Sequence, residues 1–162
     1  MRLWGGVGVT MVTCCDYLTR CDYGDLLYIL GDREPVCMCI QESMRGDRAP
    51  RSPPGYSLET LSTTQQPTPG NGLVTIIRQT APYYRLNLNT PLQALAIRIK
   101  LHKQCTVCNI YISPNEVIPP DSLAQLINQL THPFLLLSDF NGKHPIWGCN
   151  SADGRGATVR QL

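Results

Sequence analysis

Two polar side chains follow a short apolar stretch of the chain, and their types and spacing suit a ligand site. Residues 134–137 read Phe-Leu-Leu-Leu, which predicts a strand buried on both faces, and Asp139 and Asn141 come soon after it. Alternate residues of an extended chain share a face, so we expect this carboxylate and this carboxamide to lie side by side. Ligands gather at the carboxyl ends of strands in sheets that helices flank. An ordinary turn is an alternative of similar weight, because Asp and Asn are common in turns.

Two further strands are predicted to end in polar groups. Residues 36–40 read Val-Cys-Met-Cys-Ile and lead through Gln41 to Glu42, so a second carboxylate stands where an apolar strand ends. Tyr111 lies near the end of a third strand, predicted over residues 105–112. Glu42 is also compatible with a surface or helix-capping glutamate, and Tyr111 with ordinary packing that leaves its hydroxyl at the rim. Two strands that both end in a carboxylate favour a shared site more than either does alone.

The apolar pattern also predicts the elements that would position these groups. Residues 92–101 alternate in character, so Leu95, Ile97 and Ile99 are expected on a core face and Arg98 on a wetter face. The other predicted elements are strands over 7–12 and 73–78, helices over 16–30 and 121–130, an irregular loop over 44–70, a turn over 153–156, and the first turn of a helix over 157–162.

The composition fits one globular domain. The chain has 162 residues, of which 43% are hydrophobic and 16% charged, so it can bury a core and wholesale disorder is not expected. Its net charge of +2 is close to neutral, so the overall charge does not point to nucleic acid, and any basic surface would be local. The sequence has no apolar run long enough to span a bilayer, so no membrane partner is expected.

Eight cysteines raise the question of a zinc site or of disulfides. Cys105 and Cys108 have the spacing of a zinc-ligand pair, but in the strand predicted there, residues three apart point to opposite faces. No second pair with a ligand-like loop follows them. Cys37 and Cys39 share a face of another strand and are expected to be small core residues. We therefore expect free thiols, as in a reducing intracellular compartment such as the nucleus or the cytoplasm.

Three motifs, taken in order, resemble those of a known superfamily. They are Ile40-Gln41-Glu42, Ile110-Tyr111-Ile112-Ser113-Pro114 and Leu137-Ser138-Asp139-Phe140-Asn141. Together with residues 87–93 and 144–148, they are similar to the endonuclease/exonuclease/phosphatase superfamily, and in particular to the apurinic-type endonuclease domain of jockey-like non-LTR retrotransposons. The resemblance covers residues 34–162 and leaves residues 1–33 as a divergent N-terminal segment.

The resemblance implies a fold and a partner. The fold would be α/β, a four-layer sandwich of two mixed β-sheets packed face to face with helices outside. It would be incomplete at the C-terminus, because the chain stops within the helix that begins at residue 157. The substrate would be DNA, and a reverse transcriptase domain would follow in the parent element.

The resemblance also implies a function, that of a metal-dependent endonuclease that nicks DNA by hydrolysis. It assigns roles in this reaction to the polar groups at the strand ends. Glu42 would hold Mg²⁺ or Mn²⁺, since a hard dication takes carboxylate oxygen. Asp139 would orient or deprotonate the attacking water, and Asn141 and Tyr111 would contact the scissile phosphate. The loop that follows offers Lys143 and His144 to face a phosphate, although a lone loop histidine is more often neither ligand nor base.

Two features of the superfamily pattern are missing. Members begin with a strand that ends in a metal-site Asn, and residues 1–15 contain no Asn. Members also carry a final Ser-Asp-His motif, and none of His102, His132 and His144 matches its histidine. Losing preorganised groups costs orders of magnitude in rate, so we expect weak or absent nicking. Two alternatives stay open, a non-catalytic interaction scaffold and a phosphatase of the same superfamily that acts on a small molecule.

Overall fold

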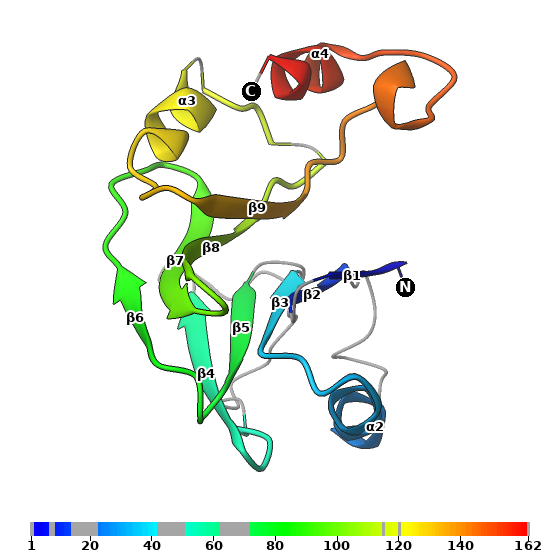
Figure 1. The fold of residues 1–162 in the computed structure, drawn as a ribbon. Helices are drawn as coiled ribbons and strands as arrows, with labels where there is room; N and C mark the ends of the chain where they lie inside the picture. Colours follow the sequence, from blue (N-terminus) through cyan, green and yellow to red (C-terminus); the bar gives the residue numbers. More distant parts are fainter. Residues whose placement is uncertain are drawn as a thin grey trace.

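Two β-sheets packed face to face form the centre of the molecule. The computed structural model describes residues 2–6, 9–13, 23–41, 51–61, 72–114, 116–119 and 121–161, and for the first two ranges and Asp139 it describes the backbone. In this part of the chain helices flank the outer faces of the sheets, α2 on one side and α3 and α4 on the other (Figure 1). This arrangement confirms the α/β sandwich expected from the sequence.

The first sheet has five strands within the described ranges, and it is mixed. Strands β2 and β3 run parallel, and the other neighbouring strands are antiparallel. Its central strand is the predicted apolar run, and every residue of that strand is buried. In spatial order the sheet consists of β1 (Arg2–Gly6), β2 (Val9–Thr13), β3 (Cys37–Gln41), β5 (Leu73–Arg78) and β4 (Tyr56–Leu61).

The second sheet has four strands within the same ranges, and it carries the sequence motifs that contain Tyr111 and Asp139. Strands β8 and β9 run parallel, while β6 and β8 both pair antiparallel with β7. The parallel pair sends both motif strands toward the same end of the sandwich. In spatial order the sheet consists of β6 (Tyr83–Leu86), β7 (Gln93–Lys100), β8 (Gln104–Tyr111) and β9 (Phe134–Asp139).

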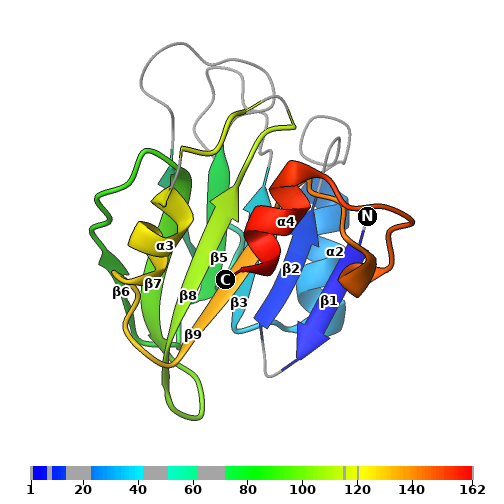
Figure 2. The ribbon, with the colours of Figure 1, turned by 90° about the horizontal axis from the view of Figure 1, so that it is seen from above.

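Helix side chains cover the outer faces of both sheets. The helix α2 (Tyr23–Arg33) buries Leu30 among apolar residues of the first sheet. The helix α3 (Ser122–Ile127) buries Leu123 and Leu126 against the second sheet. Figure 2 shows α3 and α4 (Gly154–Arg160) in front of the second sheet and α2 behind the first. No helix in the described ranges is long and apolar enough to cross a membrane.

The apolar layer between the sheets contains thiols but no disulfide among the described residues. Cys37 and Cys39 lie in this layer, where they pack with Ile97 and Val107 of the second sheet. Cys108 is buried on the other face of its sheet, and burial raises the pKa of its thiol to about 12. The described cysteines are free, as expected, and the buried ones behave as small core residues.

One polar side chain crosses the apolar layer and joins the two sheets. Asn109 of β8 is fully buried, and its Nδ2 donates to the backbone oxygens of Ile40 and Val74, each at 3.2 Å. Its Oδ1 accepts from Nε2 of Gln41 at 3.2 Å, and the same Nε2 lies 3.1 Å from the backbone oxygen of Leu137. Side-chain hydrogen bonds therefore tie β3 and β5 to β8 and β9, within an otherwise apolar layer.

The face of β7 that was expected to be wetter is buried, so that prediction was wrong. Arg98 on this face is 8% exposed. Its guanidinium donates to one side-chain oxygen and three backbone oxygens, those of Thr106, Thr131, His132 and Pro133. These acceptors replace water around the charge and allow α3 to cover the sheet.

Strand β9 is half-buried over residues 134–138, and not buried on both faces as its apolar sequence predicted. Within the described ranges it pairs with β8 and is the last strand of its sheet. Its side chains still pack on both faces. Leu135 and Leu137 contact the layer between the sheets, and Phe134 and Leu136 contact the layer under α3. The edge position therefore explains the partial exposure.

Several element boundaries also differ from the predictions. The strand expected over 7–12 corresponds to β2, which begins at Val9, while β1 was not predicted and residues 7 and 8 lie outside the described ranges. The segment 44–70, expected to be irregular, contains β4. Helix α2 continues through Gly31 to Arg33, and residues 16–22 of the predicted helix lie outside the described ranges. Burial of Leu30 compensates for the poor helix propensity of the glycine beside it.

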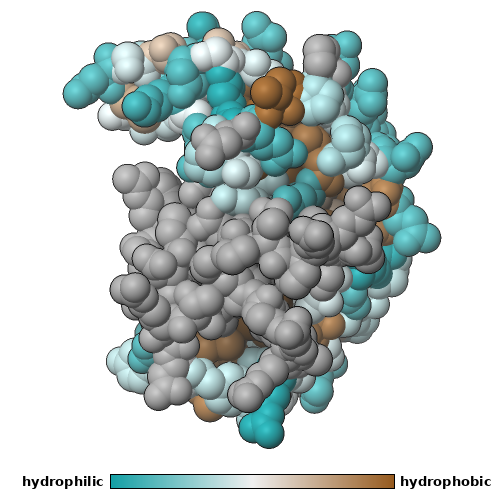
Figure 3. All heavy atoms as spheres, turned by 180° about the vertical axis from the view of Figure 1, so that it is seen from behind, coloured by the Kyte–Doolittle hydropathy of each residue, from teal (hydrophilic) through white to brown (hydrophobic). Residues whose placement is uncertain are grey.

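One face of the described surface is visible from behind the molecule. Viewed from behind, the upper part of the described surface is mostly hydrophilic, and hydrophobic residues appear there in small, separate patches (Figure 3). Single exposed apolar residues are normal on a protein surface, so each must be judged by its surroundings.

The link between the sheets makes Asn109 a stability determinant. Asn109→Ala should lower the free energy of unfolding by roughly 2–4 kcal/mol, because Gln41 loses an acceptor and two buried backbone oxygens lose their donor. Urea unfolding followed by circular dichroism measures the change. The matched control is Asn87→Ala at an exposed position, where a change within about 0.5 kcal/mol is expected. Equal effects of the two substitutions would contradict the proposed role of the link.

Candidate functional site

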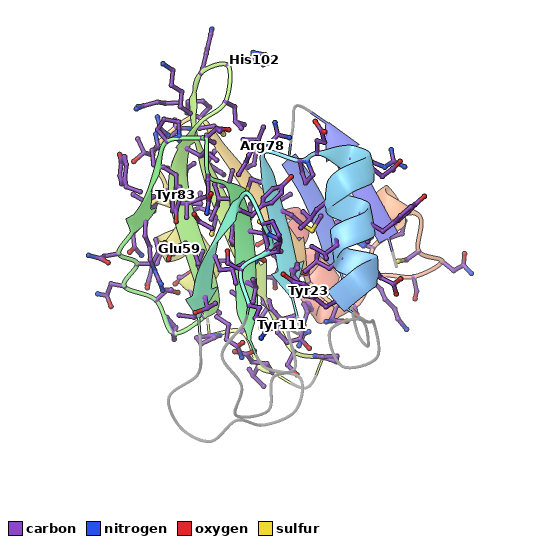
Figure 4. All side chains as sticks on the ribbon, turned by 90° about the horizontal axis from the view of Figure 1, so that it is seen from below. Tyr23, Glu59, Arg78, Tyr83, His102 and Tyr111 are labelled. Carbon is purple, nitrogen blue, oxygen red and sulfur yellow. The ribbon has the colours of Figure 1, made fainter. Side chains whose placement is uncertain are left out.

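The ends of three neighbouring strands bring polar residues into one row. Tyr111, the last residue of β8, is the register partner of Asp139, the last residue of β9. On its other side Tyr111 pairs with Gln93, the first residue of β7. Tyr111 is 3% exposed and packs against the layer between the sheets. Figure 4 shows Tyr111 at the opposite end of the molecule from His102, so the row is far from the β7–β8 hairpin.

The third predicted strand end reaches the same place. Gln41, the last residue of β3, is 1% exposed and bonds to Asn109 and to the backbone of Leu137. These partners lie two positions before Tyr111 and Asp139 in their strands. The predicted metal ligand Glu42 directly follows Gln41 but lies outside the described residues.

Asn141 reaches the site by a different route from the one predicted. The extended alternation does not continue to this residue, because β9 ends at Asp139 and Asn141 has a left-handed backbone with φ of 49°. That part of the prediction was wrong, because the chain turns at Asn141. Asparagine tolerates the left-handed conformation that this turn requires. The Nδ2 of Asn141 nevertheless donates to the backbone oxygen of Ile112 at 3.1 Å, next to Tyr111 in the chain. The carboxamide is therefore held at the end of β8.

One residue of the row has a buried polar atom without a partner. The Oε1 of Gln93 is buried and accepts no hydrogen bond from any of the described residues. A buried acceptor of this kind costs about 1–3 kcal/mol, and such groups are often found where a ligand binds. The motifs did not single out Gln93, because a glutamine at the start of an apolar strand carries no sequence signal of its own.

Arg155 joins the loops that follow β8 and β9, and sequence patterns did not identify it. Residues 153–156 were predicted as a turn, but α4 begins at Gly154, with Asp153 as its N-cap. Backbone hydrogen bonding lowers the pKa of the Asp153 carboxyl, whose Oδ1 accepts from the amide of Gly156. The guanidinium of Arg155 donates to four backbone oxygens, those of Ser113 (2.9 Å), Pro114 (3.0 Å), Glu116 (2.5 Å) and Phe140 (3.4 Å).

The loop after the site is held against the start of α4. The backbone oxygen of Lys143 accepts from the amide of Asp153 at 3.0 Å. A Cβ on Gly156 would lie 1.9 Å from that same oxygen, so only glycine fits this contact. The Lys143 side chain is exposed. The loop base and the helix start therefore form one unit beside the strand ends.

His144 has a structural role in the short 3-10 helix η1 (Pro145–Trp147). Its Nδ1 accepts from the amide of Ile146 at 3.1 Å, and its ring lies 5.1 Å from that of Trp147. An imidazole whose Nδ1 accepts carries its proton on Nε2 when neutral, which leaves that nitrogen as a donor. The predicted contact of Lys143 and His144 with phosphate stays a prediction.

The described groups offer hydrogen-bond donors for an anion, but not a complete metal-ligand set. The Asn141 amide is held at the end of β8, and the backbone of Tyr111 pairs with that of Asp139. Within the described ranges no three His, Cys, Asp or Glu residues group as metal ligands. The predicted site residues Tyr111, Asp139 and Asn141 therefore come together at one end of the second sheet.

Comparisons with known proteins agree with the motifs and the fold. Residues 105–162, which include Tyr111, Asp139 and Asn141, match the family model described as "Endonuclease-reverse transcriptase". The endonuclease domain of TRAS1, a telomere-specific non-LTR retrotransposon, aligns with a TM-score of 0.68 and 16% identity over 94% of this chain and 67% of that one. No curated protein sequence matches the chain. The resemblance to a retrotransposon endonuclease domain is thereby confirmed.

Two other solved structures align with parts of the chain. A functionally unknown conserved protein from Enterococcus faecalis V583 aligns with a TM-score of 0.50 and 14% identity, over 93% of this chain and 71% of that one. ANGEL2, a 2′,3′-cyclic phosphatase, aligns with a TM-score of 0.48 and 15% identity, over 76% of this chain and 44% of that one. At these identities the likenesses concern the fold.

The four hydrogen bonds of Arg155 should determine how firmly the two site loops are held. Arg155→Gln should increase amide hydrogen exchange in residues 113–119 and 140–143 by about tenfold, because the loops lose their shared donor. Hydrogen exchange read by mass spectrometry measures the rates. Arg160→Gln, at an exposed position of the same helix, is the control and should leave both loops unchanged. Unchanged exchange in Arg155→Gln would refute the role given to this residue.

Proposed function

We propose that this chain binds DNA and hydrolyses one phosphodiester bond of a strand with the help of a divalent cation. Its residues 105–162 match the family model described as "Endonuclease-reverse transcriptase", which supports the proposal. The observation that carries the proposal is the register pairing of Tyr111 with Asp139, with the Asn141 amide held one residue beyond Tyr111. Phosphodiester hydrolysis needs a group that activates water and donors that hold the phosphate oxygens. These three residues supply both.

Each residue has a defined task in the proposed reaction. The Asp139 carboxylate orients a water molecule and takes its proton as the water oxygen attacks phosphorus. The bond from phosphorus to one ester oxygen breaks, and that oxygen takes up a proton from solvent. A hydroxyl is left on one side of the nick and a phosphate on the other. Tyr111 and Asn141 donate to phosphate oxygens, and neutral donors do this without adding negative charge near the attack.

The residues fit a hard divalent cation by their chemistry. Glu42 would hold Mg²⁺ or Mn²⁺, because such ions prefer carboxylate oxygen. The support comes from Gln41, which directly precedes it and lies 3.1 Å from the backbone oxygen of Leu137, close to the end of β9. When bound, the cation would neutralise charge on the phosphate during attack.

The rate proposed for these 162 residues is low. The sequence before Cys15 has no Asn to share the metal site, and none of the three histidines matches the one that closes the superfamily site. Each missing group of this kind costs a factor of about 10²–10³ in rate. The description of the matching family also names a reverse transcriptase, and we extend this to the parent element as the partner activity.

Nicking of supercoiled plasmid tests the proposed reaction. With Mg²⁺ present, the folded chain should convert supercoiled DNA to open circles slowly, and EDTA should stop the conversion. Asp139→Asn should lower the rate at least about 100-fold, because the water loses its base. Asp32→Asn on α2, an isosteric change of an exposed aspartate on the outer face of the other sheet, should not.

Three outcomes of the plasmid assay are informative. Nicking that persists unchanged in Asp139→Asn would refute the assigned base. DNA binding without any nicking would favour the non-catalytic scaffold. A folded chain that neither binds nor nicks DNA would refute the proposed function altogether.

Metal binding gives a readout that does not depend on activity. Saturating Mn²⁺ should raise the unfolding temperature by about 5 °C, since a ligand at 100 times its Kd adds about 2.7 kcal/mol to the free energy of unfolding. Glu42→Gln should remove this shift, and Glu34→Gln, at an exposed position after α2, should retain it. Equal shifts in both variants, measured by differential scanning calorimetry, would rule out Glu42 as the ligand.

A further inference from the structure

An exposed aliphatic side chain stands at the tip of the loop that leaves the site. Ile146 is 71% exposed and Trp147 is 43% exposed, although both are large hydrophobic residues. They lie in η1, seven and eight residues after Asp139. Two exposed hydrophobic neighbours on one loop are an uncommon arrangement unless the loop meets a partner.

The loop that carries Ile146 is rigidly built. The Trp147 indole Nε1 donates to the backbone oxygen of Gly142 at 3.1 Å, and its ring packs on His144. The amide of Cys149 returns to the backbone oxygen of His144 at 3.3 Å, so the loop closes on itself. Trp147 is therefore occupied in holding the loop, while Ile146 projects from it. A side chain held in place loses little conformational entropy when it binds.

The loop base is joined to the strand ends by direct contacts. The Lys143 backbone lies against Gly156, and the neighbouring Arg155 bonds to the carbonyl groups of Phe140 and Ser113, which directly follow β9 and closely follow β8. A ligand held between the ends of these strands would therefore lie beside the loop. This contact path connects the exposed tip to the site without a flexible segment.

The charge of the loop is complementary to a polyanion. Residues 140–152 contain no Asp or Glu, and Lys143 is exposed within them. The nearest carboxylate along the chain after the loop, that of Asp153, is bonded to the amide of Gly156 at 2.6 Å. The Nε2 of His144 adds a neutral donor. The loop thus combines an apolar tip, which suits the groove of a nucleic acid, with a segment without acidic residues, which suits the phosphate backbone.

We propose that this loop is a DNA-contacting wedge. Lys143 binds a phosphate of the duplex, and Ile146 enters the minor groove and packs against a base step beside the bond that is cut. The inference rests on the proposed function, because it takes DNA as the substrate of the adjacent site. Apolar side chains such as isoleucine unstack base steps when they are inserted from the minor groove, and this bends the duplex toward its major groove. The wedge thus selects sites where a step opens easily, such as pyrimidine–purine steps.

A fluorescent duplex tests the wedge directly. The probe is a DNA duplex with 2-aminopurine at a TA step, whose fluorescence rises when the base unstacks. The wild-type chain should raise the fluorescence, and Ile146→Ala should abolish the rise and weaken binding about tenfold. Val117→Ala is the matched control, because Val117 is an aliphatic residue 86% exposed on the loop after β8. It should leave both signals unchanged.

The lysine makes a separate prediction from the isoleucine. Lys143→Ala should weaken binding of all sequences alike and reduce the slope of log K against log salt by about 1. Lys103→Ala, in the exposed hairpin between β7 and β8, should leave the slope unchanged. Both residues tested are exposed, so the variants should unfold at the wild-type temperature, which calorimetry checks.

The outcomes separate the wedge from the function it rests on. If the wild-type chain binds and nicks DNA and Ile146→Ala matches it in fluorescence and affinity, the wedge is refuted and the function stands. If the wild-type chain does not bind DNA, both fall. If light scattering shows a wild-type dimer that Ile146→Ala converts to a monomer, the loop is a contact between copies of the chain and the wedge is refuted.

Discussion

The structure depends on a small set of hydrogen bonds in an otherwise apolar layer. Asn109 and Gln41 bridge the two sheets where leucine and isoleucine side chains would pack equally well but would allow them to slide. Apolar contacts have no preferred direction, whereas each bond of a buried amide fixes a donor against one acceptor. The bridge therefore sets the register of β3 against β8 and β9. The ends of these strands carry the candidate site, so its geometry is determined inside the core.

Two arginines also fix the positions of chain segments by hydrogen bonds, at the two ends of strand β9. The guanidinium groups of Arg98 and Arg155 bond mainly to backbone oxygens. A planar group with five donors can collect several carbonyl groups that would otherwise be unsatisfied at loop turns. Arg98 gathers the chain that leads into β9, and Arg155 gathers the chain that leaves β8 and β9. The two guanidinium groups thus hold the chain at both ends of β9 through its backbone oxygens.

The central strands were predictable, and the reason is their composition. Residues 37–41, 73–78, 93–100 and 104–111 are continuous or alternating apolar runs, which few structures other than core strands accommodate. Strands β4 and β6 were not predicted, because Tyr56–Leu61 follows a proline-rich stretch and Tyr83–Leu86 is short and half polar. Pairing of β4 with β5 and of β6 with β7 overrides the weak local preference.

The site was predictable only in part. The sequence predicted Tyr111 and Asp139 near the ends of two strands, and the structure adds that these strands pair in parallel with the two residues in register. The contacts of Asn109, Arg155 and Gln93 depend on which segments meet in space, and no spacing along one strand encodes them. Isolated polar residues in apolar runs are the nearest sequence signal, since a buried amide needs partners.

The glycine at position 156 sets how closely the loop after β9 approaches helix α4. A Cβ at this position would lie 1.9 Å from the backbone oxygen of Lys143, so a single methyl group would push the loop away from the strand ends. Alanine stabilises most helices relative to glycine. In the first turn of this helix the same exchange should therefore destabilise the protein.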